Sequence, residues 1–387
     1  MNSSELRSTI ALAGIFGLRM LGLFLLLPVF SLHAKDLPGG QNALWVGLAL
    51  GIFNIVQAFF HIPLGTLSDR IGRKPVVLWG LSLFIAGALI AATHDDLLWI
   101  ALGRGLMGAG AISAAVSAWV ADLTREQVRT AAMAIVGGSI GISFALSLVI
   151  ATPIYRAISL DGMFLLLAGL GLIGFLVAWL LVPNPPKLIR SKPQPLKQIF
   201  LRPELFRLNV GVFVLNATQV AMFLVVPRLL VDAGLPLDDH WKIYFPVVIF
   251  SFILMLPGII YGEKKKKLRF VLLTSIVILL IAQFIFLQAH SVPTIVSALL
   301  IYFVGFNLLE ALQPALVSRW AKDEKGSALG IYNTTQSVGL FTGAALGGLL
   351  MQLFGNISVF VGGVILIIAW LIIAWPMRDI SSSQNAA

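Results

Sequence analysis

Three charged side chains interrupt runs of apolar residues, and at these positions the sequence could carry chemistry. Arg19, Arg104 and Glu310 lie inside such runs, and Glu310 is the only acid deep within one. A charge in a membrane span faces the interior of a helix bundle or a water-filled path. A carboxyl group removed from water can hold a proton near neutral pH, so Glu310 is the candidate for proton coupling. A static contact with Arg19 or with a helical neighbour is the alternative.

Amide side chains recur at helical spacing in the same runs. Polar faces of this kind point at a water-filled path, or they hydrogen-bond other helices without touching a substrate. We expect a substrate cavity lined by amides and an aromatic ring: Asn54, Gln57, Phe223, Asn307, Asn333 and Gln336. Arg104 would add a positive charge to this cavity. It lies near the start of its run, however, so it could reach the headgroups instead.

The composition defines the elements that must position these residues. Of 387 residues, 58% are hydrophobic and only 11% are charged, whereas soluble domains carry roughly 25% charged residues. At about 20 apolar residues per span, the chain holds about a dozen transmembrane helices and no large soluble domain. The absence of Cys excludes disulfides and thiolate chemistry. The spans hold no paired acids and no metal-ligand motif, so we expect neither an enzyme nor a metal or other cofactor.

The apolar runs predict an all-α membrane protein of twelve transmembrane helices in two six-helix bundles. We expect an N-terminal bundle over 1–182, a cytoplasmic linker over 183–208, a C-terminal bundle over 209–377 and a short cytoplasmic tail over 378–387. The predicted helices cover about 9–33, 42–66, 75–93, 97–121, 130–153, 162–182, 209–232, 241–262, 269–289, 292–318, 327–354 and 357–377.

The basic residues predict the orientation. With the N-terminus inside, most Lys and Arg outside the spans fall in cytoplasmic segments. The outer segments then carry only Lys35, Arg156, Arg228 and Lys242. Cytoplasmic loops are the ones enriched in Lys and Arg, so both termini are predicted inside. The net charge of +10 is thereby assigned to membrane orientation and not to nucleic-acid binding.

The most specific motif lies between the second and third apolar runs, from Gly65 to Pro75: GTLSDRIGRKP. Gly65 would let its helix approach another closely, and Gly72 permits a tight turn. An acid such as Asp69 is favoured at a helix N-terminus. The motif resembles the signature loop between helices 2 and 3 of the major facilitator superfamily. The segment from Arg104 to Gly110 resembles the helix 4 motif of that family.

The resemblance implies a conformational switch at this loop. It places Asp69 at the N-terminus of helix 11 and pairs Asp122, at the end of helix 4, with Arg73, or less favourably with Arg70. The switch residues are then Gly65, Asp69, Arg70, Gly72, Arg73 and Asp122. In the alternative, the loop charges only set the topology, and Asp122 caps the turn before helix 5.

Several segments across both halves are similar to the YajR-like drug:proton antiporters, among them Leu18–Gly22 and Asn307–Leu312. That group carries a soluble domain after helix 12, which we expect to be absent here. The resemblance implies a monomeric inner-membrane transporter that works by alternating access, with a small amphipathic compound and protons as its partners. An importer of a small nutrient and a lipid flippase remain alternatives on the same fold.

Overall fold

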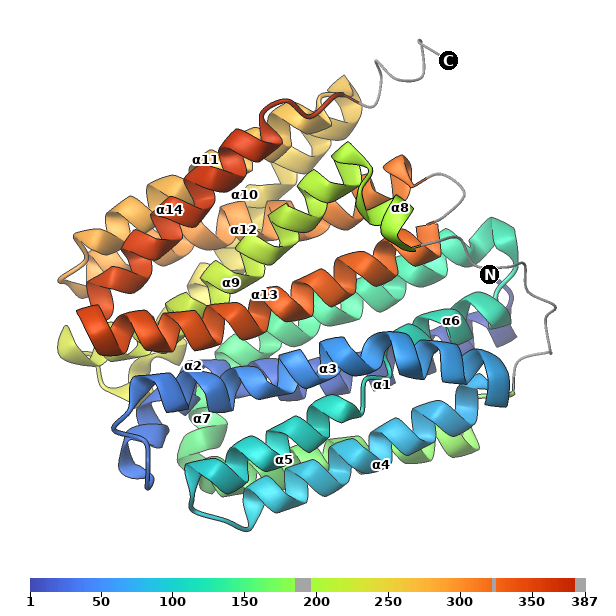
Figure 1. Cartoon of the computed structure of the whole chain (residues 1–387), viewed down its shortest axis with the longest axis horizontal. Helices are drawn as coiled ribbons and strands as arrows, with labels where there is room; N and C mark the ends of the chain where they lie inside the picture. Colours follow the sequence, from blue (N-terminus) through green and yellow to red (C-terminus); the bar gives the residue numbers. More distant parts are fainter. Residues whose placement is uncertain (185–195, 322–324, 380–387) are drawn as a thin grey trace. The chain divides into compact units, whose positions relative to one another are not determined.

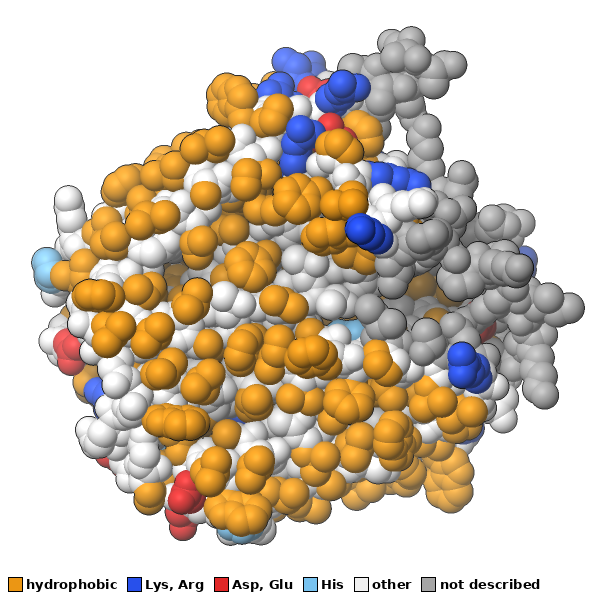
Figure 2. All heavy atoms as spheres, in the orientation of Figure 1, with side chains coloured by type: hydrophobic (Ala, Val, Ile, Leu, Met, Phe, Trp, Pro, Cys, Tyr) orange, Lys and Arg blue, Asp and Glu red, His pale blue; other side chains and the backbone are white. Residues whose placement is uncertain are grey.

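The computed structural model describes residues 1–184, 196–321 and 325–379, and every regular element within them is a helix. Eleven stretches of helix are long and apolar enough to cross a membrane. Figure 2 shows hydrophobic side chains spread over the face in view, with most of the visible Lys and Arg near its upper and right-hand edges. The chain divides into two compact units, Met1–Lys192 and Pro193–Ala387.

The described residues of the first unit form seven α-helices and one short 3-10 turn, which Figure 1 places in the fold. They are α1 (Ser3–Leu25), α2 (Leu27–His33), η1 (Ala34–Asp36), α3 (Ala43–Ile71), α4 (Arg73–Ala92), α5 (Leu97–Ala109), α6 (Ser113–Leu123) and α7 (Glu126–Leu180). Figure 1 shows α4 and α5 running side by side. One core of the unit buries Leu12, Leu81, Val116 and Trp119.

The helix α7 contains two membrane spans. Its 55 residues would extend about 80 Å as a single straight helix, far more than the roughly 30 Å of a bilayer core. Ser159 interrupts it with non-helical angles, φ 59° and ψ −176°. The fifth and sixth predicted helices are therefore two helices that meet at a turn at Ser159. Counted this way, the eleven stretches provide twelve spans.

Two helices that the sequence analysis treated as continuous are broken. The first ends at Leu25 and resumes at Leu27, with Pro28 in the first turn of α2, where its missing N–H is tolerated. The fourth is divided into α5 and α6 around Gly110. A Cβ atom at Gly110 would overlap the Gly80 carbonyl oxygen of α4. The close approach of α4 explains why glycine stands at this break.

The second unit contains two helices shorter than a span and six longer ones. They are α8 (Leu196–Phe200), α9 (Pro203–Asp232), η2 (Leu237–Asp239), α10 (Trp241–Lys265), α11 (Leu268–Leu287), α12 (Val292–Trp320), α13 (Lys325–Phe354) and α14 (Asn356–Ala374). Part of the linker expected over 183–208 is helical, because α9 begins at Pro203. Residues 185–195 of that linker and 380–387 of the expected tail lie outside the described residues.

Helix α9 is the central element of the second unit, and most of its side chains are buried. It packs along α13, where Gly339 and Gly343 lie against the backbone of Phe213 and Ala217. A Cβ atom at Gly339 would lie 2.6 Å from the Phe213 carbonyl oxygen. Small residues at such a contact bring two helix axes close together. The polar residues of α9, α12 and α13 are thereby held close to one another.

Candidate functional site

The segment predicted as the loop between helices 2 and 3 is almost entirely helical. Helix α3 continues to Ile71 and α4 begins at Arg73, so Gly72 alone makes the turn. Its φ of 105° and ψ of 159° lie in a region that glycine adopts and other residues rarely do. This corrects the expected loop: Asp69 and Arg70, which follow the predicted helix over 42–66, belong to the last turn of α3.

Arg73 and Asp122 form an ion pair at this turn. Arg73 Nε donates to Asp122 Oδ2 at 3.0 Å, and the two side chains are 3% and 12% exposed. A second guanidinium nitrogen of Arg73 donates to Ser68 Oγ, whose hydroxyl donates to the Gly65 carbonyl at 2.7 Å. The structure thus brings together the pair that the family resemblance implies. It connects the start of α4 to the ends of α3 and α6.

The other residues expected in the switch are placed less specifically. Arg70 is exposed, and the side chain of Asp69 lies outside the described part of the structure. A Cβ atom at Gly65 would lie 3.5 Å from Ala114 Cβ, an ordinary contact. Within its own unit, the close helix approach expected at Gly65 is therefore absent. Contacts of this kind occur at Gly103 and Gly108 instead.

A second ion pair, which the sequence analysis missed, lies between Glu5 and Arg125. Arg125 donates to the Glu5 carboxylate through Nε at 2.8 Å, through a terminal nitrogen at 3.2 Å and through its backbone N–H at 3.1 Å. These hydrogen bonds and the charge of Glu5 raise the pKa of the Arg125 guanidinium. The pair connects α1 to the turn between α6 and α7. The Asn2 and Glu5 spacing of a capping box was the available sequence signal.

The two intramembrane arginines point into the interior of the first unit. Arg19 is 3% exposed and donates to Ser113 Oγ at 3.1 Å, with its guanidinium 5.5 Å from the Phe53 ring centre. Arg104 is 1% exposed and donates to the Ala49 and Leu50 carbonyls of α3 at 2.8 and 2.7 Å. The alternative in which Arg104 reaches the headgroups is therefore wrong. The carbonyl oxygens and neighbouring aromatic faces stabilise its charge locally.

The amides expected to line a cavity in the first unit are buried. Asn54 and Gln57 on α3 are 3% and 4% exposed, and His61, one turn further along, is 6% exposed. The Oδ1 atom of Asn54 has no hydrogen-bond partner among the described residues. An unpaired buried acceptor of this kind suits a water molecule or a polar group of a substrate.

In the second unit, Glu310 lies at the meeting point of three helices. Its carboxylate accepts from Asn216 Nδ2 of α9 at 3.2 Å and from Gln336 Nε2 of α13 at 3.4 Å. Gln336 also donates to Asn216 Oδ1 at 3.3 Å. Glu310 is half-buried, and no ion pair to it occurs among the described residues of its unit. The arrangement is an acid held by two neutral amides, without a neighbouring cation.

The remaining predicted cavity residues of the second unit are half-buried or buried. Asn307, one turn before Glu310, donates to Ser251 Oγ of α10 at 2.9 Å. Asn333 is half-buried on α13. Phe223 is fully buried between the rings of Tyr244 and Phe303, at centroid distances of 6.4 and 6.2 Å. Phe223 therefore packs in an aromatic cluster of the second unit.

Comparison with known proteins adds the family relationship. The model of the family described as Major Facilitator Superfamily matches residues 12–309 and 249–386. The chain is 38% identical over 386 residues to the inner membrane transport protein YajR of Escherichia coli strain K12, with 98% of this chain and 85% of that protein covered. It is 28% identical to the multidrug resistance protein MdtH of Yersinia pestis, with 85% and 82% covered.

Solved structures of low sequence identity share the fold. A bacterial homologue of the human lysosomal transporter Spinster, in an inward-facing and occupied conformation, has a TM-score of 0.78 at 13% identity, with 97% of each chain covered. A D-xylose–proton symporter has a TM-score of 0.72 at 16% identity, with 97% of this chain and 98% of that chain covered. At these identities the likeness concerns the fold alone.

Proposed function

The chain belongs to the Major Facilitator Superfamily, and from this premise we propose that it is a proton-coupled exporter of a small amphipathic compound, working by alternating access. The family and the transporter fold establish a multi-pass membrane transporter. The name of the MdtH relatives, multidrug resistance protein, supports export over import. We propose further that the protein is a monomer in the inner membrane, that both of its termini are cytoplasmic, and that it is not an enzyme.

The proposal of proton coupling is based on the groups that surround Glu310. Two amide N–H groups stabilise its charged form, while partial burial favours the neutral form. No cation among the described residues of its unit fixes it as a carboxylate. Small changes in water access can therefore decide whether it holds a proton. In our proposal Glu310 is protonated when it is withdrawn from water. It releases the proton when α9, α12 and α13 move apart and water reaches the carboxyl group.

Within the first unit, the proposed cargo contacts are charged and amide side chains of its buried interior. Arg19 would face an anionic or polar group of the cargo, since two of its guanidinium nitrogens have no hydrogen-bond partner among the described residues. Asn54 would offer its free acceptor to a donor of the cargo. Arg104, whose nitrogens bond α3 carbonyls, would position α3 and not contact cargo.

The proposed switch consists of Arg73, Asp122, Ser68 and the turn at Gly72, together with Asp69. Alternating access requires two states that differ by only a few kcal/mol. A partly buried ion pair, with hydrogen bonds of about 1 kcal/mol each, is large enough to shift such a balance. We propose that this network stabilises one of the two states, and that Asp69 acts in the switch as an acid at a helix N-terminus.

The experiment that tests the function compares wild type with Glu310→Gln. A compound-sensitivity panel on cells lacking and overproducing the protein first identifies a cargo. Transport of that cargo is then measured in proteoliposomes with and without an imposed pH gradient. We expect Glu310→Gln to abolish pH-driven transport but to keep cargo binding, since glutamine has nearly the same shape and cannot release a proton.

Asp95→Asn, at an exposed acid of the first unit, serves as the matched control and should transport like wild type. Full pH-driven transport by Glu310→Gln would eliminate this residue as the coupling site. Transport that is independent of the pH gradient in the wild type would eliminate proton coupling itself.

A further inference from the structure

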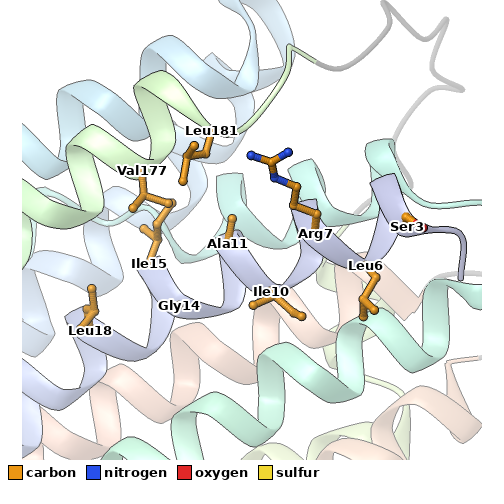
Figure 3. A pocket seen from close by; sticks show the side chains of 10 residues that line it. All are labelled: Ser3, Leu6, Arg7, Ile10, Ala11, Gly14, Ile15, Leu18, Val177 and Leu181. Atoms are coloured by element: carbon orange, nitrogen blue, oxygen red, sulfur yellow. The ribbon is translucent and has the colours of Figure 1, made fainter.

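An apolar groove of about 600 Å³ runs along the first unit, between α1 and the end of α7. Its floor is formed by small and aliphatic side chains, including Ala11, Gly14 and Ile15, and Val177 and Leu181 form one wall (Figure 3). The lining residues of α1 extend from Ser3 to Leu18, about 22 Å of helix. This length exceeds the hydrocarbon depth of one leaflet, about 15 Å.

One positive charge stands at the end of the groove nearest the N-terminus. Figure 3 shows the Arg7 guanidinium extending from α1 toward Leu181. The acid nearest in sequence, Glu5, is buried on another face of α1 and accepts hydrogen bonds from Asn2 and Arg125. Arg7 is exposed, and among the described residues it has no ion pair and no hydrogen bond from its side chain. No acid lines the groove.

The end of α7 beside Arg7 is also suited to an anion. Lys74 Nζ donates to the carbonyls of Trp179 and Val182 at 2.6 and 3.0 Å. Trp119 Nε1 donates to the Pro183 carbonyl at 3.1 Å. These bonds cover oxygen atoms at a helix C-terminus that would otherwise repel a negative group. Lys74 places a second positive charge next to Leu181.

We propose that this groove is a binding site for an anionic phospholipid. Its acyl chain lies on Ala11, Gly14 and Ile15, and its phosphate contacts Arg7 at the end where Lys74 adds positive charge. Trp179, exposed at the same end, suits the level of the headgroups, where tryptophan is enriched. Basic residues near a helix end are the recognition element for anionic headgroups. Neither Arg73 nor Asp122 is among the residues that line this groove.

The binding test counts lipids retained by the purified full chain in native mass spectrometry. The probes are phosphatidylglycerol and phosphatidylcholine with the same palmitoyl and oleoyl chains. We expect the first phosphatidylglycerol to bind about fivefold more tightly than phosphatidylcholine. Arg7→Gln should reduce this preference to near one, while Arg7→Lys should retain most of it. Equal affinity for the two lipids in wild type, or an unchanged preference in Arg7→Gln, overturns the proposal.

A second variant tests the groove itself. A Cβ atom at Gly14 would meet no atom within 4 Å, so the side chain of Gly14→Leu starts in open space at the groove that Gly14 lines. We expect Gly14→Leu to lower the affinity for the first bound phosphatidylglycerol molecule by at least fivefold. Gly169→Leu makes the same change at an equally open position outside the groove and should leave binding unchanged. Undiminished binding in Gly14→Leu would show that the lipid sits elsewhere.

Discussion

Arg73 and Asp122 form an interaction whose free energy can be measured before any cargo is known. Both side chains are largely buried, so loss of one partner removes the opposite charge that compensates the other. We expect Asp122→Asn or Arg73→Gln to lower the free energy of unfolding by about 1–3 kcal/mol. The double variant should lose about 1 kcal/mol less than the sum of the two single variants.

The measurement is thermal unfolding, in one detergent, of wild type, the two single variants and the double variant. Arg70→Gln changes an exposed arginine in the last turn of α3 and serves as the control, with an expected effect within about 0.5 kcal/mol. Strictly additive losses in the double variant would mean that Arg73 and Asp122 do not interact energetically.

At the level of single residues, the sequence identified candidate site residues better than it identified their hydrogen-bond and ion-pair partners. The motif and the family resemblance led to Arg73 and Asp122 as a pair. The meeting of Glu310 with Asn216 and Gln336 could not be predicted, because it depends on how three helices pack. Likewise, nothing in the spacing around Arg104 showed that its acceptors would be the Ala49 and Leu50 carbonyls. Side-chain polarity indicated these residues, and tertiary contact determined what they bind.

At the scale of the elements, the contact between α4 and α5 depends on glycine. A Cβ atom at Gly103 would lie 2.5 Å from the Gly87 carbonyl oxygen and 2.8 Å from the Ala91 nitrogen. We expect Gly103→Ala to force the helices apart and to lower stability by about 2 kcal/mol or more. Gly105→Ala, on the same helix, places its Cβ 3.6 Å from Ile52 and should be neutral. Comparable melting temperatures for the two variants would contradict the close contact.

At the turn inside α7, we expect a substitution to raise the stability of the protein. Ser159 adopts φ 59° and ψ −176°, a conformation that costs a residue with a side chain about 1–3 kcal/mol. Ser159→Gly should therefore stabilise the protein by about 1 kcal/mol, whereas Ser159→Val should destabilise it. Ser159→Ala removes the hydroxyl but keeps a Cβ atom, so the backbone strain remains. This control variant should therefore melt at the same temperature as wild type. A lower melting temperature in Ser159→Gly would refute this reading of the turn.

Helix positions could largely be predicted from the sequence, because long apolar runs must span a membrane. The breaks could not. Pro28 was compatible with a continuous first helix, since proline occurs in transmembrane helices. The break at Gly110 depends on its contact with Gly80, which sequence spacing does not show. The connection expected over 67–74 is almost entirely helical, because Gly72 alone reverses the chain.

At the scale of the whole molecule, the orientation in the membrane can be tested with single cysteines, because the chain has none of its own. We expect a membrane-impermeant maleimide, applied to intact cells, to label Lys35→Cys and Lys242→Cys. Lys197→Cys and Lys265→Cys should be labelled only after the cells are opened. All four positions are exposed. Labelling of Lys265→Cys in intact cells would reverse the proposed orientation.

The buried arginines have a consequence for biosynthesis. An arginine at the centre of a span opposes insertion into the bilayer by about 2.5–3.5 kcal/mol. For Arg104 the compensating carbonyls of Ala49 and Leu50 lie earlier in the chain, so they are already in the membrane when α5 leaves the translocon. Arg19 has the reverse order, because its acceptor Ser113 is synthesised later. The first span must therefore stay in the bilayer with its charge only partly compensated until α6 is made, and nascent chains that stop before α6 should be the ones most readily lost to quality-control proteases.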